Sequence, residues 1–295
     1  MFSNIVAIVL PVFLLASVGY FWIRFGFTYE TAFVTRMVTY IGSPALIFGA
    51  MAASTITPNA FSQMILASAA LHFAMMGSGF VLLSLLKLDV RTYLPPFFVA
   101  NGGNLGLPVC LFAFGAEGLA LGVAYFVVQV LLMFTAGIWL LSGQASPKAF
   151  LKMPMIYAAV LGVIVTLYQL EVPVWIVNTT TLAGDLTIPL MLITLGVSLA
   201  TLNTTGISRA ALFSVAKLAI GISWAFFIVW ALGLTGPARG VLLLQSAMPS
   251  AVYTYLFAEH YNREPANIAG IVFISTLFAV AVLPVLVGYV LATAS

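Results

Sequence analysis

Long apolar segments separated by short polar connections make up almost the whole chain. A helix needs about 20 apolar residues to cross a bilayer. Ten segments of this kind follow one another, at residues 4–24, 33–53, 60–86, 92–114, 117–141, 153–170, 174–201, 208–233, 237–260 and 265–292. Stretches of strictly alternating apolar and polar residues, typical of membrane β-strands, do not occur. The pattern predicts an all-α polytopic membrane protein with ten transmembrane helices.

Composition narrows the class further. The 295 residues are 63% hydrophobic and 6% charged, whereas a soluble domain carries about 25% charged residues. A soluble globular protein is therefore excluded, and no nucleic-acid partner is expected. The first segment has no basic region before it and is too long for a signal peptide, so we expect it to be the first spanning helix. The single cysteine, Cys110, permits no intrachain disulfide and is expected to fill apolar space.

Lysine and arginine residues set the predicted orientation. The odd-numbered connections, or the helix ends beside them, hold eight basic residues: Arg24, Arg36, Lys87, Arg91, Lys148, Lys152, Arg209 and Arg263. The even-numbered connections hold only Arg239. Because basic residues concentrate on the cytoplasmic side, we expect both termini outside and the central connection in the cytoplasm. The predicted location is the inner (plasma) membrane, with lipid around the chain.

Prolines recur at matching places in the two halves of the chain. Three pairs lie 143, 145 and 141 residues apart: Pro11 and Pro154, Pro44 and Pro189, Pro108 and Pro249. Five spans per half force the halves into opposite orientations, which is the inverted-repeat plan of secondary transporters. We therefore expect a first five-helix repeat at residues 1–141, a cytoplasmic loop at 142–152 and a second, inverted repeat at 153–295. The alternative is that three matched prolines arose by chance.

Two interruptions of the apolar pattern are the candidate binding site. Residues 101–108 read Asn-Gly-Gly-Asn-Leu-Gly-Leu-Pro, and residues 245–255 contain a second proline break. Broken helices free backbone groups, and their N-termini attract carboxylates. The predicted substrate contacts are Asn101, Gly103, Asn104, Pro108, Gln245, Met248, Pro249, Ser250, Tyr253, Thr254 and Ser43. The alternative is that the Asn and Ser side chains only cap the broken ends.

Ionisable residues deep in a span are functional hypotheses. Asp185, near mid-depth of the seventh span, and His72, in the third, are the candidate coupling residues. Each has a structural alternative, a protonated helix cap for Asp185 and a packing role for His72. Lys217 is expected to extend along the helix to the cytoplasmic interface. Metal-ligand spacings, phosphate loops and nucleophile motifs are absent from the sequence, so we expect neither an enzyme nor a cofactor.

The first break resembles a known family motif. The Asn-x-x-x-x-Gly-x-Pro spacing of residues 101–108 is similar to the first crossover of the auxin efflux carrier family, which includes bacterial malonate-type carriers and plant PIN proteins. Residues 247–249, followed by 257–262, resemble its second crossover and the end of its ninth helix. Residues 189–196 and 264–284 are similar to its seventh and tenth helices.

The resemblance implies a carrier of organic anions that works as an elevator and forms a homodimer. It implies a scaffold of helices 1, 2, 6 and 7 and a transport part of helices 3–5 and 8–10. Asn101 and Pro108 match the family's substrate-site asparagine and crossover proline, and Pro249 matches the second proline. Plant members continue with Gln-Gly-Ile-Val-Pro, whereas residues 250–254 read Ser-Ala-Val-Tyr-Thr, which argues against auxin itself as the substrate.

The predicted function is secondary transport of a small carboxylate, such as the dicarboxylate malonate, driven by protons or by the anion's own gradient. A sodium-coupled bile-acid-type carrier is the alternative, since it shares ten spans and crossed helices. Drug/metabolite exporters place both termini inside, which the basic residues oppose. A channel would need a ring of like charges or a pore loop, and a receptor would need a soluble sensor; the sequence has neither.

Overall fold

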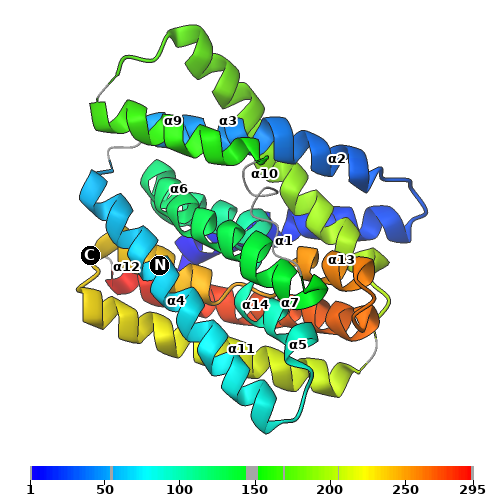
Figure 1. Cartoon of the computed structure of the whole chain (residues 1–295). Helices are drawn as coiled ribbons and strands as arrows, with labels where there is room; N and C mark the ends of the chain where they lie inside the picture. Colours follow the sequence, from blue (N-terminus) through cyan, green and yellow to red (C-terminus); the bar gives the residue numbers. More distant parts are fainter. Residues whose placement is uncertain (1, 54–55, 144–151, 169, 205, 294–295) are drawn as a thin grey trace.

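The computed structural model describes residues 2–53, 56–143, 152–168, 170–204 and 206–293 (Figure 1). Within these ranges the chain is helical, and the one β-bridge is isolated. The helices of the first half are α1 (Phe2–Arg24), α2 (Thr31–Met37), α3 (Ser43–Ala53), α4 (Pro58–Leu85), α5 (Val90–Phe98), α6 (Leu107–Leu132) and α7 (Ile138–Ser142), with π-helical turns η1 (Val38–Gly42), η2 (Gly102–Gly106) and η3 (Met133–Gly137). Those of the second half are α9 (Pro154–Tyr168), α10 (Val174–Thr201), α11 (Ile207–Leu232), α12 (Gly236–Ser246), α13 (Val252–His260) and α14 (Pro265–Thr293).

Among the described residues, seven helical stretches are long and apolar enough to cross a membrane: Ser3–Arg24, Thr31–Ala52, Pro58–Leu85, Gly102–Ser142, Val174–Thr201, Ile207–Leu232 and Pro265–Thr293. This confirms an all-α polytopic membrane protein. The count differs from the ten predicted segments for a physical reason. The segments at 92–114 and 237–260 are each divided at a break, so α5, α12 and α13 are short, and α9 has only 15 residues. The ten-span topology stays a prediction.

The predicted boundary between the fourth and fifth segments is a kink within α6. Gly115, at φ 62 and ψ −150, is not helical. Residues with a Cβ rarely adopt such a conformation, so glycine is the residue type that allows this bend. Two segments predicted as separate spans therefore form one continuous run of helix that changes direction between them.

The helices divide into two packed groups. In one, α10 packs against α1 and α3, and α3 packs against α9; in the other, α4 packs against α6 and α11, and α11 packs against α14. Figure 1 shows α9 and α3 on one side of the molecule and α4, α11, α12 and α14 on the other. Glycine allows the closest contact of the first group, because a Cβ on Gly196 would meet the carbonyl of Ala16. Small residues bring membrane helices together in this way.

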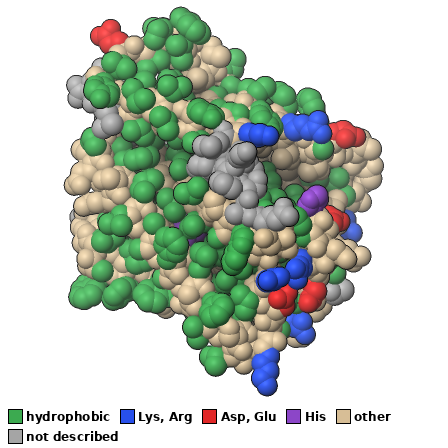
Figure 2. All heavy atoms as spheres, in the orientation of Figure 1, with side chains coloured by type: hydrophobic (Ala, Val, Ile, Leu, Met, Phe, Trp, Pro, Cys, Tyr) green, Lys and Arg blue, Asp and Glu red, His purple; other side chains and the backbone are tan. Residues whose placement is uncertain are grey.

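Charged side chains gather at one end of the molecule. Arg263 forms an ion pair with Asp89 at 3.7 Å, and the Tyr93 hydroxyl donates to Glu264 at 2.6 Å and accepts from Arg209 at 3.2 Å. These residues belong to the third, seventh and ninth connections or the helix ends beside them. Figure 2 shows most charged side chains of this face at its right and lower margins, with hydrophobic side chains spread over the remainder. The predicted orientation puts all odd-numbered connections on the same side of the membrane, so it requires these residues to lie at one end of the molecule, as they do.

Asp89 also begins α5, since its carboxylate accepts from the backbone N–H of Arg91 at 3.2 Å and from the Thr92 hydroxyl at 2.5 Å. Partial burial opposes ionisation, but these hydrogen bonds and the charge of Arg263 outweigh it and lower the pKa of Asp89. The carboxylate is therefore ionised at neutral pH and caps the helix.

Candidate functional site

The two breaks cross and hydrogen-bond to each other. Ala100 and Ser250 form an antiparallel β-bridge. The backbone N–H of Asn101 donates to the Pro249 carbonyl at 2.7 Å, and that of Ala251 donates to the Val99 carbonyl at 3.1 Å. Backbone N–H and C=O groups at the two breaks have no partners within a helix, so each break supplies hydrogen-bond partners to the other. The predicted meeting of two interrupted helices is thus observed.

Neighbouring side chains satisfy further backbone carbonyls of the breaks. The Gln129 amide donates to the Ala100 carbonyl at 2.8 Å, and the Lys217 ammonium donates to the Met248 carbonyl at 2.7 Å. Ser250 is fully buried, and its hydroxyl donates to the Pro96 carbonyl at 2.7 Å. Its own N–H donates to the hydroxyl of a serine on α14 at 3.0 Å. Irregular backbone at this depth is therefore held inside protein rather than facing lipid.

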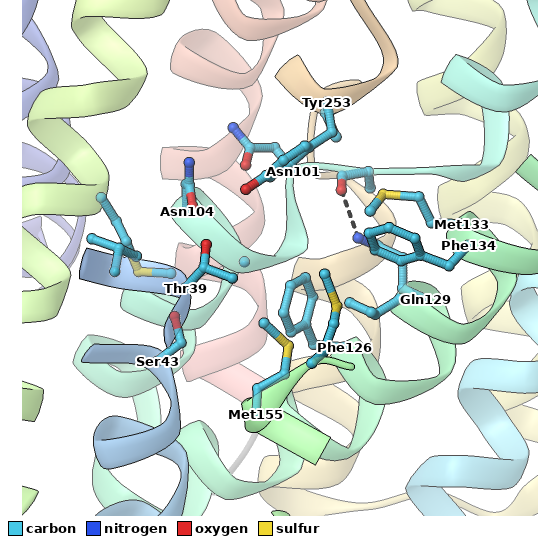
Figure 3. Close-up of a pocket in the computed structure, with 17 residues that line it drawn as sticks. Thr39, Ser43, Asn101, Asn104, Phe126, Gln129, Met133, Phe134, Met155 and Tyr253 are labelled. Atoms are coloured by element: carbon cyan, nitrogen blue, oxygen red, sulfur yellow. Dashed lines mark hydrogen bonds between the residues drawn. The ribbon is translucent and has the colours of Figure 1, made fainter. Parts of the chain in front are cut away.

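A pocket with about 580 Å³ of empty space lies beside the crossing. Figure 3 shows Asn101, Asn104 and Tyr253 toward one side of it, and Phe126 and Met155 toward the opposite side. Its lining residues carry no charge: Val38, Thr39, Ser43, Ala100, Asn101, Gly103, Asn104, Phe126, Gln129, Val130, Met133, Phe134, Met153, Met155, Met191, Ala251 and Tyr253. The pocket therefore has one polar wall, built from the crossing and η1, and one wall rich in methionine and phenylalanine.

Asn101 supplies an unsatisfied hydrogen-bond donor to this pocket. Its side chain is only 5% exposed, and its amide nitrogen has no hydrogen-bond partner among the described residues. Asn101 also stands at the N-cap position of η2 but makes no side-chain cap bond. Buried polar groups without partners are rare in folded proteins, so this amide is available to a ligand.

A second pocket, with about 470 Å³ of empty space, adjoins the first and shares Val38, Thr39, Asn104, Met191 and Tyr253 with it. Its further lining residues are mostly small and polar: Thr31, Thr35, Thr194, Ser198, Val252 and Leu256. The side chains of Tyr29 and Thr194 are hydrogen-bonded at 2.7 Å beside it. This pocket leads from the crossing toward the connection between α1 and α2.

The structure separates the predicted substrate contacts into two sets. Five line the pocket: Asn101, Gly103, Asn104, Tyr253 and Ser43. Six do not: Pro108, Gln245, Met248, Pro249, Ser250 and Thr254. The second set builds the crossing instead, and several of its polar groups make internal hydrogen bonds. The Gln245 amide donates to the Gly102 carbonyl at 3.4 Å, for example, and the Thr254 hydroxyl donates to the Ala251 carbonyl at 2.6 Å.

None of the three ionisable residues considered in the spans lines either pocket. Asp185 occupies an exposed position on α10, outside the walls of both pockets. The expectation that Lys217 extends to the interface is wrong. Lys217 is only 3% exposed, and its Nζ donates to the carbonyl of Met248, which lies in the break between α12 and α13. His72, 1% exposed, lies behind the crossing with its Nδ1 2.7 Å from the Ser68 carbonyl.

Several pocket residues were not predicted from the sequence: Thr39, Phe126, Gln129, Met133, Phe134, Met153, Met155 and Met191. Gln129 could have been predicted as a site residue, since a side-chain amide inside a long apolar segment needs a hydrogen-bond partner. Methionine and phenylalanine carry none, because they are ordinary in membrane helices. Among the described residues, no group of three or more His, Cys, Asp or Glu side chains is placed to hold a metal ion.

Comparisons with known proteins agree with this architecture. A family model described as "Membrane transport protein" matches residues 141–287. An uncharacterized transporter of Methanocaldococcus jannaschii is 27% identical over 305 residues, covering 94% of this chain and 96% of that protein. An uncharacterized transporter of Methanothermobacter thermautotrophicus is 32% identical over 197 residues, covering 62% of this chain and 63% of that protein.

A plant protein shares part of the chain. Auxin efflux carrier component 1 of Arabidopsis thaliana is 24% identical over 143 residues, which cover 46% of this chain and 23% of the plant protein. The family model and the relatives together cover both halves of the chain, and they agree with its apolar helices. The chain is a membrane transporter and belongs to the membrane transport protein family, the family of the auxin efflux carriers.

Proposed function

We propose that this transporter is a secondary carrier of small organic anions, which it binds at the crossing of its two broken helices. The observation that carries the proposal is the buried Asn101 amide, which has no partner among the described residues and lines the pocket beside the crossing. An amide N–H donates to a carboxylate oxygen without adding a fixed charge.

Two helix N-termini support an anionic substrate. η2, which continues into α6, begins at the pocket with Asn101 as its N-cap, and α13 begins there with Ala251. Neither N-cap side chain bonds to the helix it precedes. The first N–H groups of a helix lack internal partners, and the helix dipole places partial positive charge there. Two such ends beside one amide favour a carboxylate in a pocket that has no basic side chain.

The apolar wall bears on the rest of the substrate. Phe126, Phe134, Met133, Met155 and Met191 face the space beyond the polar crossing. A small dicarboxylate such as malonate would need donors at both ends, and this wall offers few. The walls of the pocket favour a substrate with one carboxylate and an apolar or aromatic body, because burial of apolar surface contributes about 25 cal/mol per Å².

An inverted repeat is supported by matched helix contacts. If the halves at residues 1–141 and 153–295 are related by a two-fold axis, the contact between α1 and α10 corresponds to that between α9 and α3. The contact between α4 and α6 then corresponds to that between α11 and α14, and all four are present. Such pseudo-symmetry is typical of transporters with a site at the repeat interface. We propose ten spans in this arrangement, with both termini outside.

The two packed groups support an elevator-type motion. We propose that α1, α2, α3, α9 and α10 form the scaffold and that the remaining helices move with the crossing. The substrate pocket lies between them, since it is lined from η1 and α10 on one side and from α6 on the other. The adjoining pocket leads toward the connection between α1 and α2, which we place in the cytoplasm, so this conformation would face inward. A homodimer remains a prediction from the family resemblance.

A thermal-shift experiment on the purified protein tests the function. We use indole-3-acetate and phenylacetate as probes of one carboxylate on an aromatic body, not as the physiological substrate, since residues 250–254 argue against auxin itself. We expect both to stabilise the protein more than malonate, malate or oxoglutarate. Stabilisation follows RT ln(1 + [L]/Kd), about 2.7 kcal/mol at a hundredfold excess over Kd. Indole-3-acetamide, which has the same body but no charge, is the matched control and should have little effect. Equal stabilisation by the amide, or none by any anion, would refute anion binding. Uptake into liposomes in sodium or choline buffer distinguishes the sodium-coupled alternative.

A further inference from the structure

Two buried basic side chains lie on the far side of the crossing from the substrate pocket. His72 on α4 is 1% exposed and Lys217 on α11 is 3% exposed. Both line a small cavity with about 250 Å³ of empty space, to which Leu71, Met75, Phe97, Phe98, Ala100, Tyr125, Gly221, Gln245 and Ser246 also contribute. The predicted substrate pocket does not include either residue. A buried lysine and a buried histidine around one cavity need an explanation, because isolated charges are costly to bury.

Lys217 has a neutral partner and no counter-ion. Its Nζ donates one N–H to the Met248 carbonyl at 2.7 Å, a bond that the neutral amine and the ammonium can both make. Among the described residues, the one ion pair joins Arg263 and Asp89, so no carboxylate compensates Lys217. Met248 directly precedes Pro249, whose carbonyl accepts from Asn101. An anion in the substrate pocket would therefore supply the missing negative charge from across the crossing.

His72 is connected to the other break. Its Nδ1 lies 2.7 Å from the Ser68 carbonyl and must donate to it, which leaves Nε2 as a proton acceptor. Nε2 has no partner among the described residues, and neither does the side-chain oxygen of Gln129, which interacts with the ring. A proton on Nε2 would turn it into a donor facing that oxygen. The Gln129 amide nitrogen already holds the Ala100 carbonyl, so each basic residue is linked to one break.

We infer that His72 and Lys217 form a single proton-binding site that is coupled to the anion site across the crossing. This inference rests on the proposed function. When the anion binds, one proton from solution forms an N–H bond at the free lone pair of Lys217 Nζ or of His72 Nε2. Two positive charges on buried side chains around one cavity repel each other, so the pair takes up one proton rather than two. The protonated Lys217 side chain then stabilises the Met248 carbonyl at the second break, as a metal cation would. For this reason we expect transport without sodium.

The other groups around the cavity do not replace this pair. α6 contributes Tyr125, whose ring centroid is 4.9 Å from that of His72, and Cys110, which contacts Gln245. Both are neutral acids rather than bases. The residues that α5, α12 and α14 bring to this cavity or to the small neighbouring one beside Lys217 do not titrate: Phe97, Phe98, Gln245, Ser246, Ser275, Phe278 and Ala279. Arg209 is eight residues from Lys217 on α11, about 12 Å along the axis, and bonds to Tyr93.

Proton uptake on anion binding tests the coupling. Indole-3-acetate is added to the purified protein in weak buffer, and proton uptake is followed with a pH-sensitive dye. We expect about one proton per anion, and a Kd that rises about tenfold per pH unit above the midpoint of the site. Lys217→Arg, with its permanent charge, should bind the anion without proton uptake and without pH dependence. Lys217→Met should bind the anion weakly, with any remaining uptake at His72, and Lys217→Met combined with His72→Gln should take up no proton. Lys152→Met, at an exposed lysine, should match the wild type. Binding without proton uptake in the wild type, or uptake retained in the double variant, would overturn the inference.

A measurement without anion keeps this inference separate from the proposed function. The melting temperatures of the wild type, Lys217→Met and Lys152→Met are compared between pH 5 and 10, in sodium and in potassium salt. We expect the pH profile of Lys217→Met to differ in shape from the other two, and sodium to match potassium. Coincident profiles, or specific stabilisation by sodium that Lys217→Met abolishes, would overturn the proton site even if indole-3-acetate binds. Distinct profiles without binding of any anion would leave the proton site standing and refute the anion carrier.

Discussion

Gly106 tests whether the two broken helices cross as closely as described. Its φ of −69 and ψ of −43 are ordinary helical values, so the backbone itself does not require glycine. A Cβ at this position would meet the side-chain amide of Gln245, with 2.8 Å to both Cδ and Nε2. Gln245 is fully buried and bonded to the Gly102 carbonyl, so it has little room to move away. Gly106→Ala should therefore force the crossing apart.

The size of the effect follows from two opposing contributions. An extra methyl group in a well-packed site costs about 1–3 kcal/mol, and replacing glycine by alanine inside a helix gains about 0.5–1 kcal/mol. We expect Gly106→Ala to destabilise the protein by about 1–2 kcal/mol. The melting temperature in detergent should fall by several degrees, at about 2–4 °C per kcal/mol.

Two further variants make the assay specific. Gly77 lies on α4, where an added Cβ would meet no neighbouring atom within 4 Å, so Gly77→Ala should leave the melting temperature unchanged or raise it. Gln245→Ala combined with Gly106→Ala should recover part of the loss, with a coupling of about 0.5–3 kcal/mol between the two sites. If Gly106→Ala is as stable as Gly77→Ala, the close crossing of η2 and α12 is wrong.

Three other substitutions test separate contacts by thermal unfolding in detergent. Ser250→Ala removes the donor to the buried Pro96 carbonyl and should cost about 1–3 kcal/mol; an unchanged melting temperature would contradict that bond. Gly196→Ala places a methyl against the Ala16 carbonyl and should separate α1 from α10, with a loss of about 1–3 kcal/mol. Asp89→Ala removes the cap of α5 and should cost about 1 kcal/mol at pH 7. Because the pKa of Asp89 is lowered in the folded protein, this contribution is complete above the unfolded value near 3.9 and is lost as the pH falls through the folded value. The gap between wild type and Asp89→Ala should therefore close in acid, and a gap that persists would refute the capping role.

The breaks were predictable because proline and glycine act locally. Pro249 lacks an N–H wherever it stands, and glycine-rich residues 101–106 tolerate irregular backbone, so both interruptions could be found without a structure. The apolar pattern likewise identified the membrane class. The contacts between the two breaks depend on packing between residues that are 150 positions apart in the chain, such as Ala100 and Ser250. Composition carries little information about such contacts.

Side-chain direction was the weaker part of the prediction. A lysine in a membrane helix often extends its long side chain to the interface, but Lys217 turns inward and donates to the Met248 carbonyl. Gln245 and Ser250 were expected to face the substrate; instead Gln245 bonds to the opposite break and Ser250 to the Pro96 carbonyl on α5. Asp185 lies on the outer face of α10. In each case the position of the polar residue along its segment follows from the sequence. The direction in which the side chain points depends on contacts with residues that are distant in sequence.

The affinity of the Asn101→Ala protein for indole-3-acetate tests the central claim most directly. A hydrogen bond to a charged group contributes about 1.5–3 kcal/mol, so Asn101→Ala should bind the anion about ten- to a hundredfold more weakly than the wild type. Asn59→Ala, at an exposed asparagine of α4, should bind it normally. Isothermal titration calorimetry at fixed pH measures all three. A folded Asn101→Ala protein with wild-type affinity would contradict a substrate site at the crossing.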